Sequence, residues 1–124
     1  MAGKKNLGMG LDLLLSSAGA INSQNDTHFL EQSKELMNKA LSADNSRCPF
    51  EAYYYYRKLI DSVPDQEMHT SPEILSTVSQ ACNNAGVILF EHGYSNDAIK
   101  LLELALKLDP QNRTAGENFK AISE

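Results

Sequence analysis

The residue types that most often carry chemistry are few and widely spaced in this sequence. There are two cysteines, Cys48 and Cys82, and three histidines, His28, His69 and His92. A structural zinc site needs about four such ligands, usually as two closely spaced pairs, and no histidine here lies close to a cysteine in the sequence. We therefore expect no metal site and two buried or half-buried thiols in a reducing compartment.

Catalytic groups are equally scarce. No Ser/His/Asp or Cys/His set and no phosphate-binding loop is visible, although such arrangements activate a nucleophile or hold a cofactor. Glu91 and His92 are adjacent at the expected end of a helix, where a solvated pair of charges is a simpler interpretation than a catalytic dyad. The sequence predicts no catalytic residue, no cofactor and no enzymatic activity.

Composition narrows the kinds of partner. The 124 residues are 42% hydrophobic with a net charge of −5, which suits one soluble domain with a modest core. The eleven Lys and Arg are scattered, whereas a nucleic-acid surface needs a basic face. No stretch approaches the roughly 18 uncharged apolar residues that span a bilayer. We expect a protein partner, with no nucleic acid and no membrane span.

The N-terminus has the outline of a secretory signal: two lysines, an apolar run at 7–15 and small residues at 18–20. Asp12 places a charge in the middle of the apolar run, and Gly8 and Gly10 weaken its helix, so the run is a poor signal core. The sequence therefore favours a cytoplasmic location.

Helices must position whatever function the chain has. After a tail at 1–26, which we expect to be flexible because Ser, Gly, Ala, Asn and Gln dominate 16–26, apolar residues recur at helical spacing to the end of the chain. The predicted helices run from Asp26 or Thr27 to about Ala43, from Pro49 to about Ser62, from Pro72 to just before Gly93, from a cap at Ser95 or Asn96 to before Pro110, and from Arg113 to Ser123. We expect an all-α fold, an antiparallel helix-turn-helix array of about five helices.

Residues 79–112 carry a pattern of small residues and one proline. Small side chains where two helices cross let their axes approach closely, and a proline ends the second helix. The positions that carry the pattern are Gly86, Gly93, Ala98, Ala105 and Pro110, with Leu102 as the large apolar residue between the helices. This segment resembles one tetratricopeptide repeat, a helical unit of about 34 residues. The usual bulky residue and tyrosine are replaced by Cys82 and Ser95.

A degenerate copy appears at about 33–66 when Pro64 is aligned with Pro110. The offset, 110 − 64 = 46, is twelve more than one repeat of about 34 residues, which makes 67–78 an insertion. Residues 113–123 resemble the opening of a further repeat and would cap the stack, so 27–124 form the predicted domain. Two repeats and a cap are fewer than the usual three or more. Either the extra burial comes from the first helix and the insertion, or the chain self-associates through an unfinished end.

The resemblance implies function as well as fold. Proteins with this repeat are generally interaction modules whose first helices line a concave groove for a peptide or helix. The groove positions carried onto this chain are Gln80, Asn83, Asn84, Val87, Phe90 and Glu91. The lysines that some relatives use to hold a C-terminal carboxylate are missing, since Asn83 and Val87 stand at neighbouring positions. A structural role between helices for Asn83 and Asn84 is the alternative.

Four consecutive tyrosines, Tyr53 to Tyr56, invite a similar question. Tyrosine is enriched at interfaces, but on a helix the four point in different directions. We expect Tyr56 in the core, and two interpretations remain for Tyr53 and Tyr54: a boundary between core and solvent, or an exposed partner contact.

The N-terminal segment at 4–15 is too apolar for an idle tail. Its docking residues would be Lys4, Lys5, Leu7, Leu11, Leu14 and Leu15. With Gly8 and Gly10 they resemble the segment of ParB-type chromosome-partitioning proteins that contacts a ParA-type ATPase and stimulates hydrolysis. The resemblance implies a ParA-like ATPase as partner; docking on another protein or on the chain's own groove, and no specific role, are the alternatives.

The sequence thus predicts a bacterial, cytoplasmic, non-catalytic adaptor or scaffold that uses a repeat groove for one partner and a tethered peptide for a second. A short linker would allow both to be engaged together. The alternatives are a regulator of a ParA-like ATPase acting through 4–15, and a purely structural subunit of a larger assembly.

Overall fold

Five helices make up the described part of the chain. The computed structural model describes residues 15–62 and 71–124, with side chains described from residue 28 onward. The helices are α1 (Leu15–Asn45), α2 (Pro49–Asp61), α3 (Pro72–Glu91), α4 (Ser95–Leu108) and α5 (Arg113–Ser123). Residues 15–62 and 71–124 contain no strand, and the predicted all-α helical array is confirmed.

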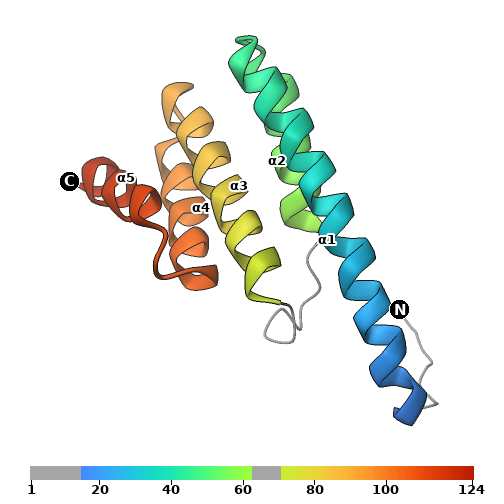
Figure 1. The fold of residues 1–124 in the computed structure, drawn as a ribbon. Helices are drawn as coiled ribbons and strands as arrows, with labels where there is room; N and C mark the ends of the chain where they lie inside the picture. The colour runs from blue at the N-terminus through green and yellow to red at the C-terminus, as the bar shows by residue number, and fades with distance from the viewer. Residues whose placement is uncertain (1–14, 63–70) are drawn as a thin grey trace.

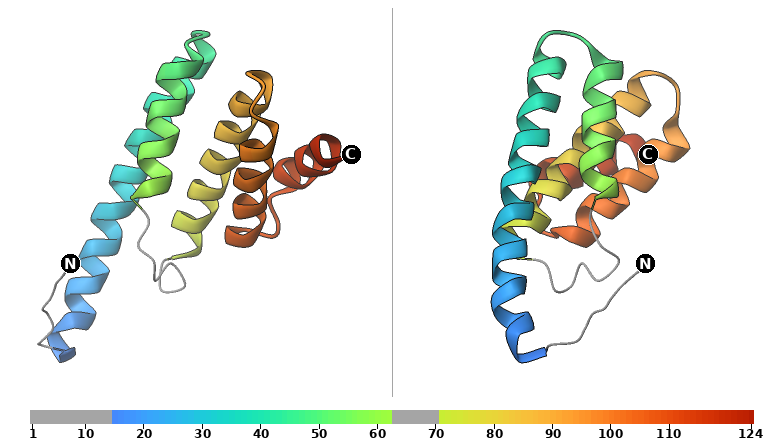
Figure 2. Two further views of the ribbon diagram at one scale, coloured as in Figure 1. Left: turned by 180° about the vertical axis from the view of Figure 1, so that it is seen from behind. Right: turned by 90° about the vertical axis from the view of Figure 1, so that its right-hand side faces the viewer.

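The helices pair in chain order. α1 and α2 form one antiparallel hairpin, α3 and α4 form a second, and α5 packs on the far side of α4 (Figure 1). The hairpins stack because α2 contacts α3, and α3 also contacts both α1 and α5. Figure 2 shows from two further sides that α1 extends well past the level at which α2 ends and α3 begins. α1, α3 and α5 therefore succeed one another along one side of the array.

Local signals explain where α3 begins and ends. The Ser71 hydroxyl accepts a hydrogen bond from the Ile74 backbone N–H at 3.3 Å, and Pro72 supplies the fixed dihedral of a first helical position. Past the other end, Gly93 has φ +91°, a conformation that glycine adopts without strain. Both boundaries agree with the sequence prediction.

The start of α4 differs from the prediction. Its N-cap is Tyr94, without a side-chain cap hydrogen bond, rather than Ser95 or Asn96. The backbone supplies the missing support, since the Tyr94 N–H donates to the Leu89 carbonyl at 2.8 Å and the Tyr94 carbonyl accepts from the Ala98 N–H at 2.9 Å. These bonds fix the turn before α4, whose first N–H groups receive no hydrogen bond from a capping side chain.

α1 also begins earlier than expected, at Leu15 instead of Asp26 or Thr27. The chain has no proline before Pro49, so nothing in this stretch forbids a helix. Once a helix is nucleated, each added residue gains a hydrogen bond at little cost. The polar composition that suggested a linker is compatible with a solvated helix, while 1–14 lie outside the described residues.

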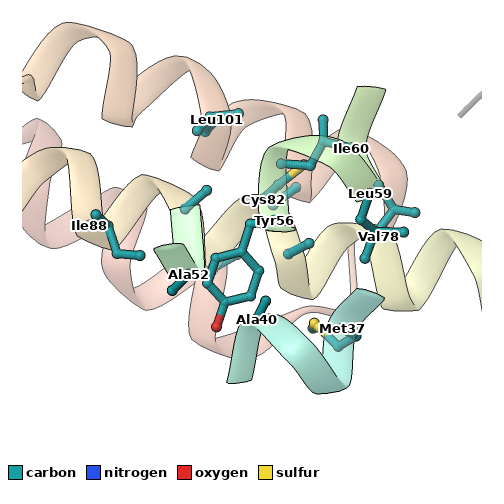
Figure 3. Packing of buried hydrophobic residues seen from close by; sticks show 14 of the residues in the cluster. Met37, Ala40, Ala52, Tyr56, Leu59, Ile60, Val78, Cys82, Ile88 and Leu101 are labelled. Atoms are coloured by element: carbon teal, nitrogen blue, oxygen red, sulfur yellow. The ribbon is translucent and has the colours of Figure 1, made fainter. Parts of the chain in front are cut away.

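The core lies where the helices of the two hairpins meet. The Tyr56 side chain is fully buried, as predicted, and its ring lies amid apolar residues of α1, α2 and α3 (Figure 3). The other fully buried large apolar residues are Leu59, Ile74, Val78, Cys82 and Leu102. Tyr54 remains 56% exposed, which agrees with the different directions expected of the four tyrosines.

A glycine permits the close approach of α3 and α4. A Cβ atom on Gly86 would lie 3.2 Å from the Ala98 carbonyl oxygen and 3.3 Å from Cγ of Leu102. Both distances are shorter than ordinary van der Waals contact. Gly86 therefore allows the close packing of the second hairpin, which is the role that the sequence pattern predicts for a small residue at this position.

The two cysteines differ in environment. Cys82 is buried, as expected, whereas Cys48 is exposed and the expectation of a buried or half-buried thiol is wrong there. Burial raises the pKa of the Cys82 thiol to about 12. A thiol is a weak nucleophile when its pKa is raised in apolar surroundings, so Cys82 acts as a core residue. Among the described helices, none combines the length and the apolar character that crossing a membrane requires.

Candidate interaction surface

The six predicted groove positions occupy one side of α3 at different depths. Gln80 and Glu91 are exposed, Asn84 and Val87 are half-buried, Phe90 is 44% exposed and Asn83 is 6% exposed. Such a range of exposure is expected on a helix whose flanks pack against two neighbours. The flanking helices are α1 and α5.

Tyr56 joins the two hairpins through hydrogen bonds. Its hydroxyl donates to Oδ2 of Asp44 in α1 at 3.0 Å and accepts from Nδ2 of Asn84 in α3 at 3.2 Å. Burial and the Asp44 carboxylate together raise the pKa of Tyr56 above its usual range, so the hydroxyl keeps its proton. One phenol thus connects three helices, and a buried polar group acquires the partners it needs.

The chain of hydrogen bonds continues to α5. Nδ2 of Asn83 donates to Oδ1 of Asn84 at 3.1 Å, and Oδ1 of Asn83 accepts from Nδ2 of Asn118 at 2.9 Å. Asn83 and Asn84 therefore have the structural role between helices that the sequence left open. Their additional use in binding a partner remains a prediction.

The orientation of these amides follows from their bonds. In each bond above, the donor must be an NH₂ group or the phenol and the acceptor an oxygen. Once Asn84 donates to Tyr56 and accepts from Asn83, its amide cannot rotate without breaking both bonds. Asn84 keeps a second N–H and Asn118 keeps its Oδ1 outside the bonds described. Both residues are half-buried.

A second set of bonds closes residues 79–112 on themselves. The Ser79 hydroxyl donates to the Ala105 carbonyl at 2.7 Å and is fully buried. Nδ2 of Asn112 donates to the same hydroxyl at 2.8 Å, and Oδ1 of Asn112 caps α5 by accepting from the Ala115 N–H at 3.1 Å. The first and last residues of the segment, Ser79 and Asn112, are thus bonded to each other. Asn112 also sets where α5 begins.

Apolar side chains lie beside the hydrogen-bonded residues. Leu41 precedes Asp44 by three residues and Val87 follows Asn84 by three. Each apolar residue therefore shares a helix face with a residue of the hydrogen-bond chain. Leu41 is 38% exposed and Val87 is half-buried. We call this surface the inner face; its residues are Leu41, Asp44, Asn84, Val87, Phe90, Glu91 and Asn118. It combines oriented polar groups with apolar side chains that water reaches.

These observations agree with the comparison with known proteins. The model of the tetratricopeptide repeat matches residues 79–112. This segment is a tetratricopeptide repeat. Its bounds are those predicted from the sequence, and its Ser79–Asn112 bond joins its two ends. No curated protein and no solved structure matches the chain.

The repeat indicates the general class of function. Tetratricopeptide repeats are typically non-catalytic modules for protein–protein interaction, in which the first helix of each repeat contributes to the binding surface. In this chain that helix is α3, which carries all six predicted positions. In the described segments, no group of three or more His, Cys, Asp or Glu residues could hold a metal ion.

Three members of the inner face, Leu41, Asp44 and Asn118, are not among the six groove positions that the sequence predicts. Asp44 falls between the predicted first and second helices, and Asn118 falls within the predicted cap at 113–123. The available signal for Asn118 was its position, since it is the sixth residue counted from Arg113, as Asn84 is from Ser79. Of the predicted docking peptide, Lys4, Lys5, Leu7, Leu11 and Leu14 lie outside the described residues, and Leu15 is the first residue of α1.

Proposed function

We propose that this protein is a non-catalytic adaptor that binds a peptide or helix of a partner protein on its inner face. The observation that carries the proposal is the hydrogen-bond chain from Asp44 through Tyr56, Asn84 and Asn83 to Asn118. It holds the side chains of four helices in one arrangement before any ligand arrives. A preorganised surface binds more tightly because less order is lost on association.

The inner face offers two kinds of contact. Leu41 and Phe90 are 38% and 44% exposed and would gain burial under an apolar ligand side chain. The N–H group of Asn84 and the Oδ1 of Asn118 would bond to the ligand's polar groups. Apolar anchors with a few oriented polar groups are typical of helix or peptide recognition.

The test compares one substitution on the inner face with a matched one elsewhere. Phe90→Ser removes an aromatic side chain from α3 that is 44% exposed, and Tyr54→Ser removes one from α2 that is 56% exposed. Each folded variant would be used to capture proteins from a lysate of the source cell, followed by mass spectrometry. We expect Phe90→Ser to lose partners that Tyr54→Ser retains.

The result that would contradict the proposal is equally definite. Capture of the same proteins in the same amounts by the wild type and both variants would show that the inner face does not recognise them. Loss through Tyr54→Ser alone would move recognition to α2. Circular dichroism of each variant controls for unfolding, since helix content must match the wild type.

A further inference from the structure

The inner face carries negative charge beside its apolar side chains. Asp44 is half-buried, three residues after Leu41, and Glu91 is exposed, four residues after Val87. Within the described stretches, no lysine or arginine forms a salt bridge with either carboxylate. Unpaired carboxylates next to exposed apolar groups suit a ligand that combines apolar anchors with positive charge.

The chain itself contains such a segment. Residues 4–14 begin with Lys4 and Lys5 and continue with Leu7, Leu11 and Leu14. Leu11 follows Leu7 by four residues and Leu14 follows Leu11 by three. This spacing places the leucines on one side if the segment becomes helical on docking. Its leucines are complementary to the apolar side chains of the inner face, and its lysines are complementary to the carboxylates.

Distance decides which copy of the inner face this segment can reach. Leu15 and Leu41 are 26 residues apart in α1, which at about 1.5 Å per residue is about 39 Å. Leu7 and Leu11 are eight and four residues from Leu15, and even fully extended they reach about 29 Å and 14 Å. The anchors therefore fall short of Leu41 in their own chain.

The rest of the inner face is no closer. The ion pair between Lys34 and Glu73 at 3.1 Å and the link from Asp44 to Asn84 through Tyr56 show that α1 and α3 run side by side. α3 residues near Asn84 thus lie level with Asp44, and Val87 and Glu91 lie further still from Leu15. A second copy of the chain has no such restriction.

We propose that residues 4–14 of one copy dock on the inner face of a second copy. The leucines would pack against Leu41, Val87 and Phe90, and the lysines would lie near Asp44 and Glu91. This proposal rests on the proposed function of the inner face. It makes the protein self-associating, and an outside partner that binds the inner face competes with the segment from the second copy.

The experiment is sedimentation of the full chain at concentrations from about 1 μM to 1 mM. We expect the average mass of the wild type to rise with concentration beyond that of one chain. A segment variant, Leu7→Ser with Leu11→Ser, and a face variant, Glu91→Lys, should each weaken association by about tenfold or more. Glu103→Lys reverses an exposed charge on α4 and serves as the matched control, which should associate as the wild type does.

Mixing the two defective variants provides the decisive arm. The segment variant keeps a working inner face and the face variant keeps a working segment, so an equimolar mixture should recover association that neither shows alone. Because the lysine contacts are solvent-exposed, raising the salt concentration should weaken association. Glu91 is exposed, and circular dichroism of each variant checks that its helix content matches that of the wild type.

Three outcomes would overturn the proposal: a wild type that stays a single chain at all concentrations, a segment variant that associates normally, or a mixture that recovers nothing. None of them bears on the capture experiment with Phe90→Ser, so failure of the self-association leaves the proposed function standing. Loss of captured partners through the segment variant, with a single-chain wild type, would instead assign residues 4–14 to an outside protein such as a ParA-like ATPase.

Discussion

Replacing Tyr56 with phenylalanine removes one oxygen atom from the middle of the hydrogen-bond chain and leaves the aromatic ring in place. The hydroxyl donates to Asp44 at 3.0 Å and accepts from Asn84 at 3.2 Å. Its side chain is fully buried, and phenylalanine preserves the packing of the ring. The substitution therefore tests the hydrogen bonds separately from the packing of the ring.

The expected loss follows from the two bonds. A hydrogen bond between neutral groups contributes about 0.5–1.5 kcal/mol to stability, and one to a charged group about 1.5–3 kcal/mol. Asp44 and Asn84 are half-buried, so water restores part of what they lose. We expect the free energy of unfolding to fall by about 2 kcal/mol, which for a domain of this size lowers Tm by about 8–10 °C.

The pH dependence of the same pair gives an independent check. The pKa of Tyr56 is raised by burial and by Asp44, while in the unfolded chain it is about 10. Because the folded pKa is the higher one, the contribution of Tyr56 is complete below about pH 10 and is lost as the pH rises toward the folded value. The stability gap between wild type and Tyr56→Phe should stay constant below about pH 10 and narrow between about pH 10 and pH 11.

Urea unfolding followed by circular dichroism at several pH values measures both effects. Tyr54→Phe is the control, because it removes a hydroxyl from a side chain that is 56% exposed, and it should change stability by less than about 0.5 kcal/mol. A Tyr56→Phe variant as stable as the wild type near neutral pH would refute the hydrogen-bond chain as a stabilising element. A gap that stays constant to pH 11 would refute the assignment of the raised pKa.

Two further substitutions and one labelling reaction test other parts of the fold. Gly86→Val should destabilise by about 2–3 kcal/mol in urea unfolding, because its side chain would meet the Ala98 carbonyl oxygen, 3.2 Å from an added Cβ. Gly93→Ala should cost about 1 kcal/mol through its φ of +91° alone. Iodoacetamide should label the exposed Cys48 and spare the buried Cys82 until urea unfolds the chain, as mass spectrometry would show.

Helix boundaries were predictable where the signal is local. Ser71 and Pro72 fix the start of α3 through contacts that reach only three residues along the chain, to Ile74. Pro110 prevents α4 from continuing. Such signals act through dihedrals and neighbouring amides, so the sequence suffices. Where the support was a backbone turn, as at Tyr94, the side-chain signals at Ser95 and Asn96 indicated the wrong cap.

The polar side of the candidate site could not be predicted in the same way. Asn83 and Asn118 are 35 residues apart, and Asn84 and Tyr56 are 28 apart. Their contact depends on how the hairpins stack, which is decided by the apolar core. Sequence position alone gave Asn83 and Asn84 as groove residues, without indicating that their amides bond first to neighbouring helices.

The hydrogen-bond chain also indicates which helix of the inner face opens at the lowest free energy. Tyr56 ties α2 to both α1 and α3 from within the core, whereas Ala115 is the one buried residue of α5. α5 is held in addition by the Asn118–Asn83 bond and by its cap at Asn112. An element with little buried apolar surface opens at low free energy. A ligand that contacts α3 and α5 together therefore stabilises α5 as it binds, and part of its binding free energy goes into holding that helix in place.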